Sequence, residues 1–193
     1  NQPGGWQHVE LRIDERLNNL RDLLNLGVHV GDFVAIDTAP EITDTGFINS
    51  RHLDDKAGAA VLLAVIEAVI RTGVKLPVSC HPLFTISEEV GSGASAALHM
   101  DVAEMLTIDN GTTAPGQNSS EFGVTIAMAD QSGPFDYHLT HRMIDLCQEF
   151  GIHHQRDVFR YYRSDSAAAV EAGNDVRTAL VTFGIDASHG YER

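Results

Sequence analysis

The stretch that decides the fold is LFTISEEVGSG at residues 83–93, where an apolar run meets two adjacent carboxylates and then small residues. The apolar part predicts a β-strand over residues 77–87, with Glu88 and Glu89 at its carboxyl end. Open α/β sheets bind ligands in the crevice outside the carboxyl ends of their strands. At such an end both acids can lean into one cleft, so we expect one to hold a metal and the other to handle a proton. Taken alone, such a pair is more often a solvated acidic turn than a site, so the interpretation depends on partners elsewhere in the chain.

The composition limits the class of protein and its partners. The chain has 193 residues, of which 43% are hydrophobic, and this is enough for one buried core. Its formal net charge of -14 argues against nucleic acid or an anionic membrane as a partner, because both attract basic surfaces. No apolar run approaches the length of a membrane span. Cys80 and Cys147 stand alone in apolar contexts, and free thiols fit a reducing cytosol, so we expect a cytoplasmic protein.

Helix and strand patterns alternate from residue 54 onward. Residues 59–70 are almost wholly apolar and predict a buried helix that Gly73 ends. The later patterns predict strands at 103–109, 122–129 and 176–183, and helices at 135–150 and 164–172. This alternation predicts an α/β fold with a mixed sheet flanked by helices. Before it, the patterns predict strands at 6–13 and 28–37 with a helix at 14–24.

Further acidic and histidine side chains stand at the same expected rim of the sheet. Asp54 and Asp55 open the helix, Asp109 ends a strand, and His189 follows the last strand. Carboxylates with an imidazole are suitable ligands for zinc, cobalt or manganese, and a carboxylate that bridges two ions suits a two-metal hydrolytic site. Each residue also has a plain structural explanation: a helix N-cap, a solvated first turn, a strand-end turn and a loop tip, respectively.

Four motifs in this order are similar to those of one family of enzymes. The motifs are LDDKAG at 53–58, SEEVG at 87–91, ID at 108–109 and DASHGYER at 186–193. Together they resemble the metalloaminopeptidases of peptidase family M42, which include the tetrahedral (TET), deblocking and glutamyl aminopeptidases. The resemblance covers essentially the whole chain, and it implies a zinc-peptidase-like catalytic domain that hydrolyses N-terminal residues from peptides with two divalent ions, zinc or cobalt.

The resemblance also implies a role for each matching residue. Asp54 would bridge the two metals, and its peptide bond to Asp55 would be cis. Glu88 would be the general base that takes a proton from water. Glu89 and His189 would bind one metal, and Asp109 the other. The resemblance places substrate-pocket residues at Arg163, Ser164 and Asp165.

The chain departs from the family pattern near its beginning. The family supplies a further ligand from a His-x-Asp motif that lies before an inserted domain, and residues 1–48 of this sequence contain no His-x-Asp. Residues 1–48 resemble the end of that inserted PDZ-like or barrel-like dimerisation domain with its return linker, and residues 49–193 the C-terminal part of the catalytic domain. The closing helix of the family is absent as well.

The resemblance implies a peptide or small-amide substrate and a homo-oligomer, in the family a dodecamer. Two other functions stay open at the level of sequence. One is a small-amide deacylase or amidase of the same clan, and the other is a non-catalytic piece that only assembles.

Overall fold

The computed structural model describes residues 5–99 and 101–190. The chain divides into two compact units, residues 1–37 and 38–193. The hairpin of β1 (Glu41–Ile42) and β2 (Ile48–Asn49) belongs to the second unit.

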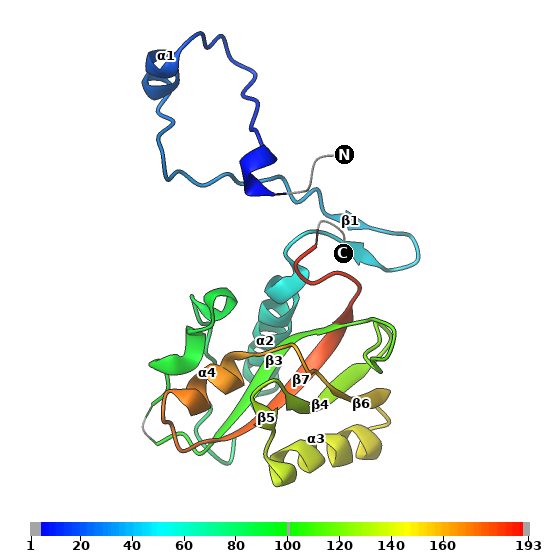
Figure 1. Cartoon of the computed structure of the whole chain (residues 1–193). Helices are drawn as coiled ribbons and strands as arrows, with labels where there is room; N and C mark the ends of the chain where they lie inside the picture. The colour runs from blue at the N-terminus through cyan, green and yellow to red at the C-terminus, as the bar shows by residue number, and fades with distance from the viewer. Residues whose placement is uncertain (1–4, 100, 191–193) are drawn as a thin grey trace. The chain divides into compact units, whose positions relative to one another are not determined.

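The first unit has little regular structure in its described residues. It contains a 3-10 turn, η1 (Trp6–His8), and one short helix, α1 (Leu20–Asn25), which Figure 1 draws in blue. The side chain of Asn19 caps α1 by accepting hydrogen bonds from the backbone N–H groups of Arg21 and Asp22. The strands predicted at 6–13 and 28–37 are wrong, because no neighbouring strand in this part of the chain pairs with them. The predicted helix at 14–24 is shorter than expected because Asn19 sets its start.

The second unit is built around a mixed five-stranded sheet. The strand order is β3 (Glu104–Thr112), β7 (Arg177–Ile185), β4 (Val124–Asp130) and β5 (Gly133–Pro134), and β6 (His154–Val158) pairs with β4. β3 and β7 are parallel, as are β4 and β6, whereas β4 and β7 are antiparallel. The mixed sheet with helices confirms the predicted fold class.

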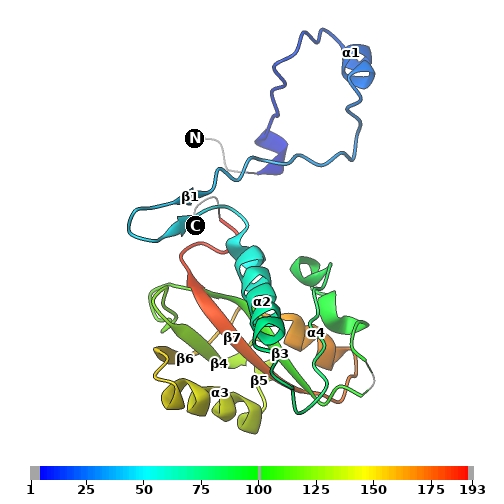
Figure 2. The same ribbon diagram turned by 180° about the vertical axis from the view of Figure 1, so that it is seen from behind.

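Three helices accompany this sheet. They are α2 (Leu53–Thr72), α3 (Tyr137–Glu149) and α4 (Asp165–Glu171). α2 packs on β3, α3 on β4 and β7, and α4 on β3 and β7. Figure 2 shows α2 across the near face of the sheet. No helix among the described residues is long and apolar enough to cross a membrane.

The core lies between the sheet and α3 and beneath the loop after β6. Ile126 and Ala127 of β4 are fully buried, and Ile126 packs with Ile144 of α3. On the other side of the same strand Ala127 packs with Phe159 and Leu180. This alternation between the two sides of β4 follows the two-residue period of a strand.

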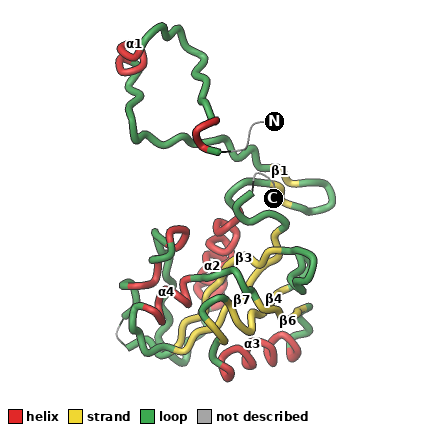
Figure 3. Tube along the Cα trace, viewed as in Figure 1, coloured by secondary structure: helices red, strands yellow, loops and turns green. Residues whose placement is uncertain are grey.

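Residues 74–87 belong to no strand, so the strand predicted at 77–87 is wrong (Figure 3). A β-strand exists through hydrogen bonds to a neighbour, and no strand of the described chain pairs with this segment. Its apolar side chains are accordingly exposed, Ile86 at 98% and Val78 at 73%. α2 is similarly uncovered, with Ile70 73% exposed. The apolar pattern predicted that these side chains would be buried. Among the described residues, however, no layer covers them.

Candidate metal centre

The first two acids of the centre lie at the start of α2. The backbone enters the helix through His52, in the left-handed region at φ 62°, and the bond between Asp54 and Asp55 is a cis peptide. The carboxylate of Asp55 turns back onto the helix, where Oδ1 accepts a hydrogen bond from Gly58 N at 3.1 Å. A Cβ at Gly58 would stand 2.3 Å from the same oxygen, so the close approach requires glycine.

The acidic pair of the deciding stretch forms a single 3-10 turn, η2 (Glu88–Val90). Gly91 ends this turn with a φ of 81°, a conformation that favours glycine. The Glu88 side chain is half-buried, and that of Glu89 is more exposed. The turn brings both carboxylates to the cavity that Asp54 and Asp109 also line.

Asp109 and His189 come to this cavity from two neighbouring parallel strands. Asp109 sits in β3 opposite Thr182 of β7, and His189 lies just beyond the end of β7. Asp109 is 5% exposed, and its Oδ1 accepts hydrogen bonds from the N and Nδ2 of Asn110 at 2.7 and 3.1 Å. His189 Nε2 lies 3.0 Å from Asp54 Oδ2 and 3.2 Å from Glu89 Oε2. The structure thus brings together all five acid and histidine side chains that the sequence analysis placed in the centre.

Burial raises the pKa values of the carboxylates in the cavity, and repulsion between the carboxylates adds to the rise. Burial raises the pKa of Asp109 to about 8, and the charge of Glu88 adds to the rise. Burial raises the pKa of Glu88 to about 7, and repulsion from the charges of Asp165 and Glu89 contributes to this rise. The pKa of Asp55 is also raised to about 7, first by burial. So many acids in one partly buried place are costly to ionise together unless a cation balances them.

The donor atoms fall into two groups that share one residue. Asp54, Glu89 and His189 offer atoms within 4.8 Å of one another, and so do Asp54, Asp55 and Asp109. Two ligands of a tetrahedral zinc, each about 2.0–2.2 Å from it, lie roughly 3.3–3.6 Å apart, and the contacts of His189 are close to this spacing. The donor set therefore fits a divalent metal ion, and Asp54 belongs to both groups. The family resemblance gave Asp55 only the cis bond, whereas the structure also places its carboxylate in the second group.

The expected substrate-pocket residues line the same cavity of about 250 Å³, together with Tyr161 and Tyr162. Arg163 forms an ion pair with Glu171. Ser164 caps α4 and is buried. Both Asp165 oxygens already accept hydrogen bonds, from Thr85 Oγ1 and Ala94 N. Of the three, Arg163 is the one that the structure leaves exposed.

Two residues of the centre were missed from the sequence. Asn110 is 1% exposed and bonds to Asp109, and its side chain also hydrogen-bonds to Asp54, whose pKa burial raises. Tyr162 donates its phenolic O–H to Asn110 Oδ1 at 2.8 Å. The sequence analysis ended the strand at Asp109, but β3 continues to Thr112. Had the strand been extended past Asp109, Asn110 would have been placed in the centre as well.

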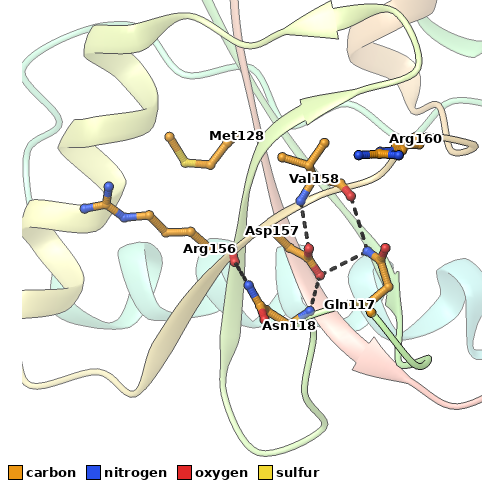
Figure 4. A pocket seen from close by; sticks show the side chains of 8 residues that line it. Gln117, Asn118, Met128, Arg156, Asp157, Val158 and Arg160 are labelled. Atoms are coloured by element: carbon orange, nitrogen blue, oxygen red, sulfur yellow. Dashed lines mark hydrogen bonds between the residues drawn. The ribbon is translucent and has the colours of Figure 1, made fainter.

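A second, larger hollow of about 540 Å³ lies apart from these acids, between the loop at 116–118 and the edge strand β6 (Figure 4). The carboxylate of Asp157 faces it but is occupied by hydrogen bonds from Gln117 Nε2 and from the backbone N–H groups of Asn118 and Ser119. Its size alone does not make it the functional site, because the titratable groups that can do chemistry gather in the smaller cavity.

The fold is that of the TET aminopeptidases. The chain superposes on aminopeptidase APDkam598 from the archaeon Desulfurococcus kamchatkensis with a TM-score of 0.75 at 19% identity, covering 92% of this chain and 52% of that one. It superposes on the Pyrococcus horikoshii TET1 peptidase with a TM-score of 0.73 at 22% identity, covering 89% and 52%. At these identities the similarity shows the fold.

The sequence comparisons show the family. The family model of the M42 glutamyl aminopeptidases matches residues 2–193, and the chain belongs to this family. It is 40% identical over 187 residues to YhfE of Bacillus subtilis (strain 168), an inferred aminopeptidase. This alignment covers 97% of the chain and 54% of YhfE, so the chain spans about half the length of that relative.

Proposed function

We propose that the protein containing this chain is a metal-dependent aminopeptidase that removes N-terminal residues from peptides. The observation that supports this most directly is the sharing of Asp54 by two groups of metal donors, with Glu88 lining the same cavity. Family membership supports the peptidase class, and the relatives it matches are aminopeptidases. They do not favour the amidase or the assembly-only alternative, so we carry neither forward.

Each acidic residue has a proposed place in the centre. Glu89 and His189 would hold one divalent ion and Asp109 the other, with Asp54 between them. The Asp55 carboxylate would support the second position, for which the resemblance implies a further histidine ligand outside this chain. The number of ions, two, and their identity as zinc or cobalt belong to this proposal.

The chemistry needs a cation, a base and a bound peptide. Divalent ions, when bound, would polarise the scissile carbonyl and lower the pKa of water. Glu88 would accept the proton of the attacking water and pass it to the departing amine. Its half-buried position in the cavity that the proposed metal ligands also line suits this role. Exposed Arg163 and the Tyr161 ring would contact the bound peptide.

Assembly, domain division and location are also proposals. We infer a homo-oligomer, since the Pyrococcus horikoshii TET1 peptidase can assemble into a tetrahedron or a large octahedral shell. Residues 1–48 would be the end of an inserted dimerisation domain with its return linker, and residues 49–193 the C-terminal part of the catalytic domain. The two free thiols, Cys80 and Cys147, support the cytoplasm as the location.

The test measures metal and turnover on the full-length protein. We expect about two divalent ions per subunit by elemental analysis, and hydrolysis of unblocked but not N-acetylated peptides. A protein that binds no divalent metal, or that cleaves both kinds of peptide equally, would overturn the proposal.

A further inference from the structure

The first turn of α4 connects the two segments that carry the acids of the metal centre. On one side Ser166 Oγ lies 2.7 Å from Thr107 Oγ1 in β3, the strand that also carries Asp109. On the other side the Asp165 carboxylate accepts hydrogen bonds from Thr85 Oγ1 at 2.6 Å and from Ala94 N at 2.8 Å. Thr85 and Ala94 stand on either side of the Glu88–Glu89 turn. One short helix end thus contacts both parts of the site.

These contacts are buried and leave little room. Asp165 is 8% exposed, Ser166 1% and Ala94 0%. A Cβ at Gly93 would stand 2.2 Å from Asp165 Oδ1 and 2.8 Å from Thr85 Oγ1, so only glycine fits between them. A buried carboxylate with both oxygens bonded holds its partners more firmly than exposed groups would, since any of them left unpaired would be costly.

The Glu88–Glu89 turn needs such an anchor because the sheet does not provide one. In the described structure residues 74–93 belong to no strand, so no ladder of backbone hydrogen bonds fixes them. Asp109, in contrast, is held within β3 by its pairing with β7. The distance between the two sets of carboxylates therefore depends on what joins the turn to β3, and the first turn of α4 makes that connection.

We propose that Asp165, through Thr85 and Ala94, is a positioning residue that sets Glu88 and Glu89 relative to Asp109. The inference rests on the proposed function. It gives Asp165 a role different from substrate contact, because its two oxygens are already used within the protein. Displacement of a catalytic group by about 1 Å can cost roughly 100-fold in rate, so this anchor would act on turnover.

The test compares Thr85→Val with Thr85→Ser in the full-length protein. The valine variant keeps the shape of the side chain and removes the hydroxyl that donates to Asp165, and the serine variant keeps the hydroxyl. Thr72→Val is the matched control, because the Thr72 hydroxyl bonds only within its own helix, to Ala68 O at 2.7 Å. Asp165→Asn is a second variant, which alters the carboxylate itself. Turnover is measured on leucyl, glutamyl and lysyl p-nitroanilides, and hydrogen exchange on the peptide covering residues 85–95.

We expect Thr85→Val to lower kcat roughly 10- to 100-fold by the same factor on all three substrates, with KM little changed. Amide exchange over 85–95 should become faster, and Thr85→Ser should restore both measurements to near those of the Thr72→Val control. Unchanged kcat and exchange in Thr85→Val would overturn the inference. So would a change restricted to one substrate in Asp165→Asn, because that would make Asp165 a contact of the substrate side chain. A wild-type protein that hydrolyses none of the substrates would overturn the proposed function, and the inference with it.

Discussion

His189 Nε2 lies 3.0 Å from Asp54 Oδ2, although Asp54 opens α2 and His189 follows β7, the last strand. β3 lies between them: α2 packs on β3, and β3 pairs in parallel with β7. The fold therefore brings together two segments that lie far apart in the sequence of the second unit. Because Nε2 also approaches Glu89 at 3.2 Å, the imidazole points at a position that three donor atoms can share.

We predict that His189→Ala weakens metal binding and that turnover falls with occupancy. Removing a residue that only hydrogen-bonds to a metal ligand costs roughly 10- to 100-fold in metal affinity. The loss of affinity in His189→Ala should be larger, because the residue removed is itself a proposed ligand. Zinc affinity measured by competition with a chromophoric chelator tests this. His153→Ala, an exposed histidine after α3, is the control and should bind zinc as the wild type does. Equal affinities of the two variants would contradict the role of His189.

Glu88→Gln separates proton transfer from metal binding. The amide keeps the shape of the side chain but cannot take up a proton, so we expect kcat to fall by roughly 10² to 10⁴ with the metal content unchanged. Kinetics and elemental analysis on one preparation give both quantities. Glu121→Gln, at an exposed position outside the cavity, should leave both unchanged. Loss of metal in Glu88→Gln would instead make Glu88 a ligand.

The sequence predicted the second half of the fold better than the first for a physical reason. Residues 103–185 form strands and helices that pair and pack with one another, so local pattern and final structure agree, as in β3 and β7. The run at 77–87 carries an equally apolar pattern, but a strand also needs a partner, which pattern alone does not supply. Glu88, Glu89 and Asp109 could be placed in one centre from the motifs they share with the family, although the strand expected before Glu88 is absent and β3 continues past Asp109 to Thr112. Tyr162 could not, because its contact with Asn110 depends on how the loop after β6 folds back.

The metal-free protein should lose stability as the pH rises. Asp109 has a folded pKa of about 8 against 3.8 for the free side chain, so between these values the folded state binds more protons than the unfolded state. The stabilisation is fully present below about pH 4 and is lost as the pH rises through about 8. In the presence of EDTA, the thermal midpoint of the wild type should therefore fall between pH 5 and 8.5 relative to that of Asp109→Asn. Added zinc at pH 8 should raise the wild-type midpoint, because a cation favours the ionised carboxylates. Parallel curves for the two proteins without metal would contradict the raised pKa.

We predict that Gly58→Ala destabilises the protein, although replacing glycine by alanine usually stabilises a helix. On helix propensity alone the change should stabilise by about 1 kcal/mol, because glycine is the poorer helix former. The new Cβ would lie 2.3 Å from Asp55 Oδ1, so the carboxylate has to leave its hydrogen bond to Gly58 N. We expect a lower free energy of unfolding and weaker metal binding, measured by urea unfolding and zinc competition. The control is Ala64→Gly, at an exposed position on the same helix. It should lower the free energy of unfolding through helix propensity alone and leave zinc affinity unchanged.

The uncovered apolar side chains of α2 should bind an apolar dye. Leu63, Val65 and Ile70 are 57%, 51% and 73% exposed, and with Val78 and Ile86 they leave a large apolar area in contact with water. A protein of residues 1–193 should enhance 8-anilinonaphthalene-1-sulfonate fluorescence while its far-UV circular dichroism shows folded α/β structure. Val65→Lys with Ile70→Glu should reduce the enhancement, and Val170→Lys, an exposed apolar position on α4, should reduce it less. A weak signal from a chain that sediments as a monomer would show that these side chains are covered within the chain itself.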